Sequence, residues 1–208
     1  MSMQKKNWKK PFLIFGVIIV TITVGACTFY FLEAQKISQS QIMLKYVQFK
    51  AENSSLNFTF EYPETGWTPV EVSGGTEKYD LVYLRGPVHT ENGFTTLIHA
   101  TVRPLESGKT APDLLEAYLK MDSNLPKFKV LHKGAREVGG EKAVSALYEY
   151  ESFPLFSEKA PPVMLKGIRV YLTSKGRLYE LMLETIGSQY DNYTPVFEHV
   201  LKTFQFKK

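Results

Sequence analysis

The sequence predicts an α+β fold in which an antiparallel β-sheet of about six to seven strands is covered by helices as an α/β/α sandwich, preceded by one transmembrane helix. Three observations lead to this prediction. A charge-free apolar run lies near the N-terminus, several later segments alternate apolar and polar residues with a period of two, and two segments carry a helical repeat. A chain of 208 residues is long enough for one such domain and an appendage.

The N-terminal run, Pro11–Leu32, has twenty-two residues and no charge. As a helix it would be about 33 Å long, enough for a hydrocarbon core of about 30 Å. Four lysines and no acid precede it, so the positive-inside rule leaves residues 1–10 in the cytoplasm as a basic tail. We therefore expect a single-pass protein of the plasma or inner membrane, with its domain outside the cytoplasm.

The same run fits two other forms of processing. A basic start followed by an apolar run is also typical of a cleaved secretory signal. Val24-Gly25-Ala26-Cys27 resembles a lipoprotein lipobox, which makes Cys27 a candidate lipidation site. We favour the uncleaved span because the next five residues prolong the apolar stretch, whereas polar residues usually follow a lipidated cysteine. All three forms put the domain outside the cytoplasm.

The part of the chain after the span is formally neutral. The sequence has 25 basic and 21 acidic residues, and the four lysines before the span leave 21 of each between Glu33 and Lys208. A nucleic-acid-binding domain needs a basic patch of its own, so we exclude nucleic acid as a partner. A single cysteine also excludes an internal disulfide.

Residues 33–55 are rich in Gln, Lys and Ser and are predicted to be a stalk or linker, and residues 56–208 are predicted to form the domain. Phe58, Phe60 and Tyr62 alternate with polar residues and begin the sheet. Turn signals such as Gly86-Pro87 and Asn92-Gly93 separate the further strands, which we expect at residues 81–85, 94–103, 128–133, 142–152, 165–174 and 177–185.

Two helices complete the predicted domain. Thr110 has the chemistry of a helix cap, and the apolar residues after it repeat at helical spacing. At the other end of the domain, Phe197, Val200, Leu201 and Phe204 form the apolar stripe of a closing helix. Because the two helices interrupt runs of strands that tight turns connect, antiparallel pairing is expected.

Several short patterns together resemble the PsbP-like family of the Mog/PsbP superfamily. They are the Tyr62-Pro63-x-x-Gly66-Trp67 turn, the Val138-Gly139-Gly140-x-x-Ala143 hairpin, the strand pair at residues 167–172 and 178–183, and the helix that ends in Thr203-Phe204-Gln205-Phe206. The resemblance covers residues 56–206. It implies a non-enzymatic domain, extrinsic to a membrane, that binds or assembles protein complexes.

No motif for catalysis, a cofactor or a metal stands out. The four histidines, His89, His99, His132 and His199, follow no ligand spacing, and the sequence has no nucleophile elbow and no phosphate-binding loop. We therefore expect no cofactor and no metal. Trp67 is interpreted as a core residue, and the strand tyrosines Tyr148, Tyr150, Tyr171 and Tyr179 as packing residues that could also line a groove.

The segment from Phe153 to Met164 is the strongest candidate for a contact with a partner. It is too long for a tight turn, and its apolar side chains are costly to leave in water; they are Phe153, Leu155, Phe156, Val163 and Met164. We predict a membrane-tethered, extracytoplasmic and non-catalytic binding or assembly module that contacts a membrane or envelope protein. The alternatives are an envelope enzyme with dispersed site residues and a carrier of small apolar ligands.

Overall fold

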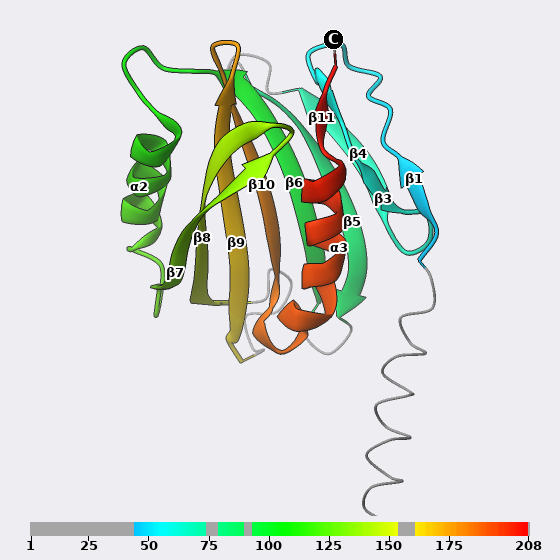
Figure 1. Ribbon diagram of the computed structural model, residues 1–208. Coiled ribbons are helices and arrows are strands. Elements are labelled where there is room, and N and C mark those ends of the chain that lie inside the picture. The colour runs from blue at the N-terminus through cyan, green and yellow to red at the C-terminus, as the bar shows by residue number, and fades with distance from the viewer. Residues whose placement is uncertain (1–43, 74–78, 90–92, 154–160, 208) are drawn as a thin grey trace, which may run out of the picture. The chain divides into compact units, whose positions relative to one another are not determined.

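The computed structural model describes residues 44–73, 79–89, 93–153 and 161–207. Its centre is one seven-stranded sheet in which all neighbours are antiparallel (Figure 1). The strand order is β4 (Thr68–Ser73), β5 (Asp80–His89), β6 (Phe94–Pro104), β10 (Arg177–Ile186), β9 (Val163–Ser174), β8 (Glu141–Ser152) and β7 (Lys129–Val138). The prediction of an antiparallel sheet of six to seven strands is confirmed.

The predicted span, Pro11–Leu32, and Cys27 within it lie outside the described residues. Among the residues that the structure does describe, no helix is long and apolar enough to cross a membrane. The compact unit begins at Lys45, before the predicted start of the domain at residue 56. Strand β1 (Tyr46–Gln48) pairs with β3 (Glu61–Pro63), and Phe49 is only 3% exposed, so the last part of the predicted linker is folded.

Helix α3 (Tyr190–Thr203) covers one face of the sheet. The predicted stripe is confirmed, since Phe197, Val200, Leu201 and Phe204 are all buried. They pack with the inward side chains of the central strands, such as Val82, Ile98, Val170 and Leu181. The short pair β2 (Phe58–Thr59) and β11 (Gln205–Phe206) completes this layer, and Trp67 is buried in the same core, as predicted.

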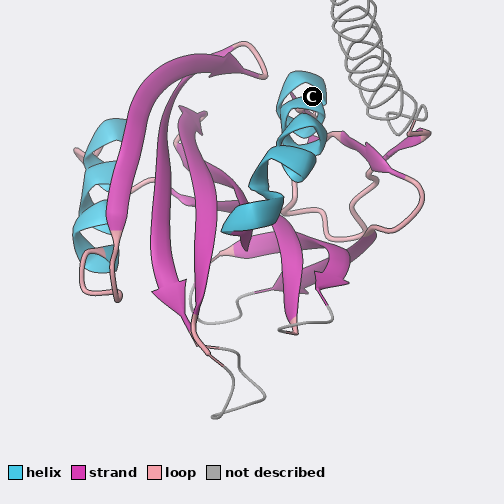
Figure 2. Cartoon of the chain, turned by 90° about the horizontal axis from the view of Figure 1, so that it is seen from below, coloured by secondary structure: helices cyan, strands magenta, loops and turns pink. Residues whose placement is uncertain are grey.

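Helix α2 (Ala111–Asp122) lies on the opposite face (Figure 2). Thr110 and Asp113 form a capping box at its start, which confirms the predicted helix signal. Leu114, Leu115 and Leu119 pack on Ala146, Tyr171 and Leu178 of β8, β9 and β10. The two helices therefore enclose the sheet as the two outer layers of the predicted sandwich.

The Gly86-Pro87 pair does not form the predicted turn. Strand β5 continues through it to His89, and the register with β6 shifts between Arg85 and Val88, which marks a bulge. A Cβ atom on Gly86 would lie 2.8 Å from the Trp67 ring, so glycine is required here for close packing. Proline is tolerated because a bulge leaves its residue outside the regular ladder.

The α2 side of the sheet is only partly covered. Along β6, residues that face α3 are buried, whereas residues that face the α2 side, from Thr95 to Arg103, are only half-buried. The helix contacts mainly β8 and β9. In the described part of the chain, the β4–β6 region of this face has no helix over it, and the candidate site begins there and extends across β10 and β9 to β8.

Candidate functional site

A groove with a volume of about 540 Å³ lies on the partly covered face, at the end of the sheet where β5 turns into β6 and β8 leads towards β9. We call it the sheet groove. Its lining is mixed, with six residues that have apolar or no side chains, Gly86, Val88, Gly93, Phe94, Leu97 and Leu165, and six polar ones, Arg85, Thr95, Tyr150, Ser152, Glu184 and Thr185. A volume of this size is typical of small-molecule and side-chain sites.

Glu184 is the half-buried acid of the sheet groove. Its carboxylate accepts a hydrogen bond of 3.2 Å from the Tyr148 hydroxyl, which also lies 3.1 Å from the Met182 sulfur. Burial raises the pKa of Glu184, although the hydroxyls of Tyr150 and Tyr148 act in the opposite direction. Burial and the charge of Glu184 in turn raise the pKa values of both tyrosines, so both remain neutral donors.

A second polar group lies deeper, between the sheet and the end of α2. The Arg169 side chain is 3.2 Å from Asp122 and 3.6 Å from Glu180, and Glu180 is 3.5 Å from His99. Burial raises the pKa of Asp122, and the charge of Arg169 lowers it in part. Burial would also raise the pKa of Glu180, but its contacts with His99 and the charge of Arg169 outweigh burial and keep that pKa below its ordinary value.

Aromatic rings fix Arg169 in place. Its guanidinium lies 5.5 Å from the Tyr118 ring and 5.4 Å from the Tyr148 ring, both within the range of cation–π attraction. The Tyr171 hydroxyl is buried beside Glu180, and burial strongly raises its pKa. The result is a connected polar network that extends from α2 to Glu184 in the sheet groove.

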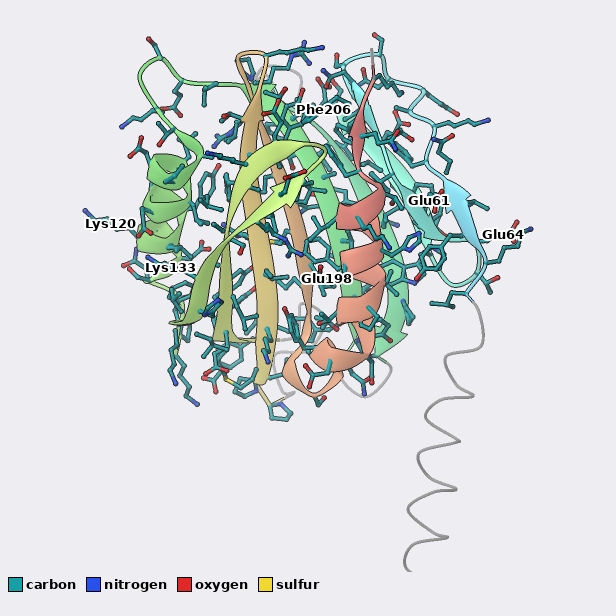
Figure 3. All side chains as sticks on the ribbon, in the orientation of Figure 1. Glu61, Glu64, Lys120, Lys133, Glu198 and Phe206 are labelled. Atoms are coloured by element: carbon teal, nitrogen blue, oxygen red, sulfur yellow. The ribbon has the colours of Figure 1, made fainter. Side chains whose placement is uncertain are left out.

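The other face has polar contacts of a more ordinary kind. Glu61 and Glu198 lie on opposite sides of α3 (Figure 3). The Glu61 carboxylate is 2.9 Å from His199, whose ring stacks on Tyr46 at 3.6 Å, and Glu198 pairs with Arg136 of β7. These contacts attach β1, β3 and β7 to the helix, and they explain His199 as a structural residue.

The predicted contact segment lies at the end of the sheet groove. Phe153 is 58% exposed and Met164 is 37% exposed, whereas Val163 is half-buried. Leu155 and Phe156 lie in residues 154–160, outside the described part of the chain. Val88, which the sequence did not single out, is 59% exposed on β5 and lines the same groove. We call Val88, Phe153 and Met164 the apolar rim.

The sheet groove offers binding chemistry rather than bond chemistry. Glu184 is a candidate proton donor or acceptor, but Ser152 and Thr95, two hydroxyls that also line the groove, have no hydrogen bond to a base among the described residues. No group of three or more metal-ligating side chains occurs in the described ranges. Of the tyrosines that the sequence marked, Tyr150 lines the groove, whereas Tyr148, Tyr171 and Tyr179 are buried.

Sequence reasoning missed Arg169, Glu180 and Glu184. A signal was present in β10. Glu180 and Glu184 lie at even steps from Leu178 and Met182, so on a strand all four side chains point to the same face. Two acids on an otherwise apolar face indicate a buried polar network.

Known structures share this fold. The cyanobacterial PsbP of Synechocystis aligns with a TM-score of 0.55 and 17% identity over 79% of this chain and 94% of its own. LpqN of Mycobacterium tuberculosis, involved in cell envelope biogenesis, aligns with a TM-score of 0.51 and 15% identity over 79% and 91%. The Ran-binding protein Mog1p of Saccharomyces cerevisiae has a TM-score of 0.49 and 9% identity over 78% and 96%. No protein-family model and no curated protein sequence matches. At these identities the first two structures establish a PsbP-like fold for the domain.

Proposed function

We propose that the protein is a non-catalytic binding or assembly module that is tethered to a membrane by residues 11–32 and contacts a membrane or envelope protein through its apolar rim. The observation that carries this proposal is the exposure of Phe153 and Met164 on either side of the connection between β8 and β9, with Val88 exposed at the same end of the sheet in the lining of the sheet groove. Exposed apolar residues next to a polar groove are typical of protein-binding surfaces.

The energetics favour a contact that is weak by itself. Burial of one large apolar side chain contributes about 1.5–3 kcal/mol, and aromatic anchors commonly dominate an interface. Two molecules held in one membrane have an effective concentration that reaches the millimolar range. A rim of three such side chains is therefore sufficient for a tethered module, although it would bind poorly from free solution.

The entry point of the chain supports the tethered arrangement. Lys45 accepts a backbone hydrogen bond of 2.8 Å from Glu64, just before the turn that leads through Trp67 into β4. Trp67 packs on Gly86, which lines the sheet groove, so the chain enters the folded unit at the same end as the groove. Twelve residues, 33–44, separate the proposed span from Lys45 and reach about 40 Å at most. LpqN, with a similar fold, is involved in cell envelope biogenesis, which fits this location.

The test compares two substitutions of equally exposed residues. Phe153 and Met121 are both 58% exposed, but Met121 lies on the outer side of α2, away from the rim. We expect Phe153→Ser to reduce retention of the protein partner from detergent-solubilised membranes about tenfold or more, and Met121→Ser to leave it unchanged. Equal retention by both variants and the parent chain, all with unchanged thermal unfolding, would contradict the rim as the contact.

The form of attachment is tested on the same purified material. An uncleaved span leaves an N-terminus at Met1 or Ser2, a lipidated chain begins at a modified Cys27, and simple cleavage leaves neither. Mass spectrometry of the intact protein separates the three. We expect the full chain, and a terminus at Cys27 would replace the span with a lipid anchor.

A further inference from the structure

The walls of the sheet groove suit an aliphatic chain. Leu165 is 4% exposed and Leu97 is half-buried, so both present fixed apolar surface to the groove. Gly86 and Gly93 add backbone without side chains, and a Cβ atom on Gly93 would meet nothing within 4 Å. The groove is therefore lined for an unbranched apolar stem that enters beside Val88.

The inner part of the sheet groove carries oxygen acceptors. Glu184 supplies a carboxylate, and Thr95 and Ser152 add hydroxyl oxygens elsewhere in the groove lining. An ammonium group has three donors and no acceptor, which is the complement of such a set. In the described part of the chain, no Lys or Arg nitrogen lies within 4.0 Å of the Glu184 carboxylate, which accepts from the neutral hydroxyls of Tyr148 and Tyr150.

The charges around the groove favour a cation. Three carboxyl groups, those of Asp122, Glu180 and Glu184, belong to the polar network, and Arg169 is the one Lys or Arg of the described residues within 4.0 Å of any of them. Arg85 also lines the groove, but it is exposed to water, which screens its charge. Of these three carboxyl groups, Glu184 is the one that lines the groove, and in the described part of the chain it has no Lys or Arg partner within 4.0 Å.

We infer that the sheet groove binds the side chain of a lysine from the protein partner, with its methylene stem against Leu97 and Leu165 and its ammonium group on Glu184. The source of the lysine rests on the proposed function, whereas the chemistry of the site does not. The apolar rim and the lysine site adjoin each other, since Val88 belongs to both. One partner segment with an apolar residue next to a lysine would occupy both.

The test uses a probe in place of the partner. N-acetyl-lysine methylamide is titrated into the full chain in nanodiscs, and the methyl resonances of Leu97 and Leu165 are followed by NMR. The control ligand is the same compound acetylated on Nε, which keeps the stem and removes the charge. We expect saturable shifts for the lysine compound and affinity about tenfold lower for the acetylated one, as a charge-assisted hydrogen bond implies.

A matched pair of variants locates the charge. Glu184→Gln keeps the shape of the side chain and is expected to lower affinity for the lysine compound about tenfold, to that of the acetylated compound. The control is Glu116→Gln. Glu116 is an exposed acid on α2 that pairs with Lys133, and its replacement is expected to leave affinity for the lysine compound unchanged. Equal binding of both compounds, or full affinity in Glu184→Gln, would overturn the inference. Tighter binding of N-acetyl-glutamate methylamide would instead identify an anion site at Arg85, and would overturn it too.

The pH dependence gives an independent readout. Only the ionised carboxylate pairs with ammonium, and burial raises the pKa of Glu184. Affinity for the lysine compound is therefore expected to fall on acidification, starting above the usual range of a glutamate, while affinity for the acetylated compound stays constant. If Phe153→Ser loses the partner but the parent chain does not bind the lysine compound, this inference alone is refuted. If the parent chain binds the lysine compound but Phe153→Ser retains the partner as well as the parent chain does, the proposed function alone is refuted.

Discussion

Substitution of Arg169 by methionine tests whether the polar network under α2 is held together by a single cation. The change keeps an apolar stem of similar length but leaves Asp122 and Glu180 without the guanidinium that lies 3.2 and 3.6 Å from them. Removal of one partner from a buried ion pair typically costs about 3–5 kcal/mol, because a buried charge is left uncompensated. Since the network lies at the edge of the covered region, we expect the lower value, about 3 kcal/mol.

The pH dependence follows from Glu180. Its pKa in the folded protein lies below the ordinary value of 4.5, so its contribution to stability is present above that value and is lost as pH falls through the folded pKa. Loss of the guanidinium raises this pKa, which allows the carboxyl to become neutral at a higher pH. The gap in stability between the parent chain and Arg169→Met is therefore full at pH 7 and shrinks towards pH 4.

The assay is thermal and urea unfolding of the full chain at pH 7 and pH 4. A loss of about 3 kcal/mol corresponds to a decrease in Tm of about 6–12 °C for a domain of this size. Arg136→Met is the matched control, because Arg136 pairs with the more exposed Glu198 on the other face and should cost less than about 1 kcal/mol. Adding Glu180→Gln to Arg169→Met should restore at least half of the loss. Equal losses for the two arginines, or a gap that does not change with pH, would refute this account.

Two further substitutions test the packing around the site. Gly86→Ala places a Cβ atom 2.8 Å from the Trp67 ring and 3.1 Å from a backbone oxygen of Thr96. We expect the free energy of unfolding to fall by about 1–3 kcal/mol, with a change in tryptophan fluorescence. Gly134→Ala is the control, because the nearest atom to its Cβ is 3.4 Å away, and unfolding that is identical for the two variants would argue against this account. Thr110→Ala removes the capping box of α2, and chemical denaturation should show a loss of about 1 kcal/mol, whereas no measurable loss would mean that the cap is replaced by water.

The elements that the sequence predicted well are those with a strong local signal. The turns at Gly139-Gly140 and Lys175-Gly176 require positive φ angles, and all four residues adopt them, so the hairpins β7–β8 and β9–β10 were predictable. The short strands β1, β4 and β11 were not, because two to six residues carry too little periodicity. Strand β4 also contains Pro69, which disguises an edge strand as a loop.

The candidate site was predictable only in part. Phe153 and Met164 were found because apolar residues in a long connection are unusual in themselves. Glu184 and Arg169 were not, since their importance depends on which strands are neighbours. Strand β10 lies between β6 and β9, and β6 is separated from β9 by a helix and two strands in the chain. Only that tertiary pairing brings Glu180 between His99 and Arg169.

The position of the sheet groove follows from the number of covering elements. Seven strands about 4.8 Å apart make a sheet about 29 Å wide, whereas a helix with its side chains is about 10 Å wide and covers two or three strands. The α3 face adds β1–β3 and β2–β11 to its helix, but the α2 face has α2 alone in the described part of the chain. Strands β4–β6 must therefore keep a half-polar surface on that side, and the boundary of helix cover is where a half-buried acid such as Glu184 can still be reached from outside. A partner that brings its own apolar and basic side chains would supply the cover that a second helix over β5 and β6 would otherwise provide, and this is why such a partner suits this face.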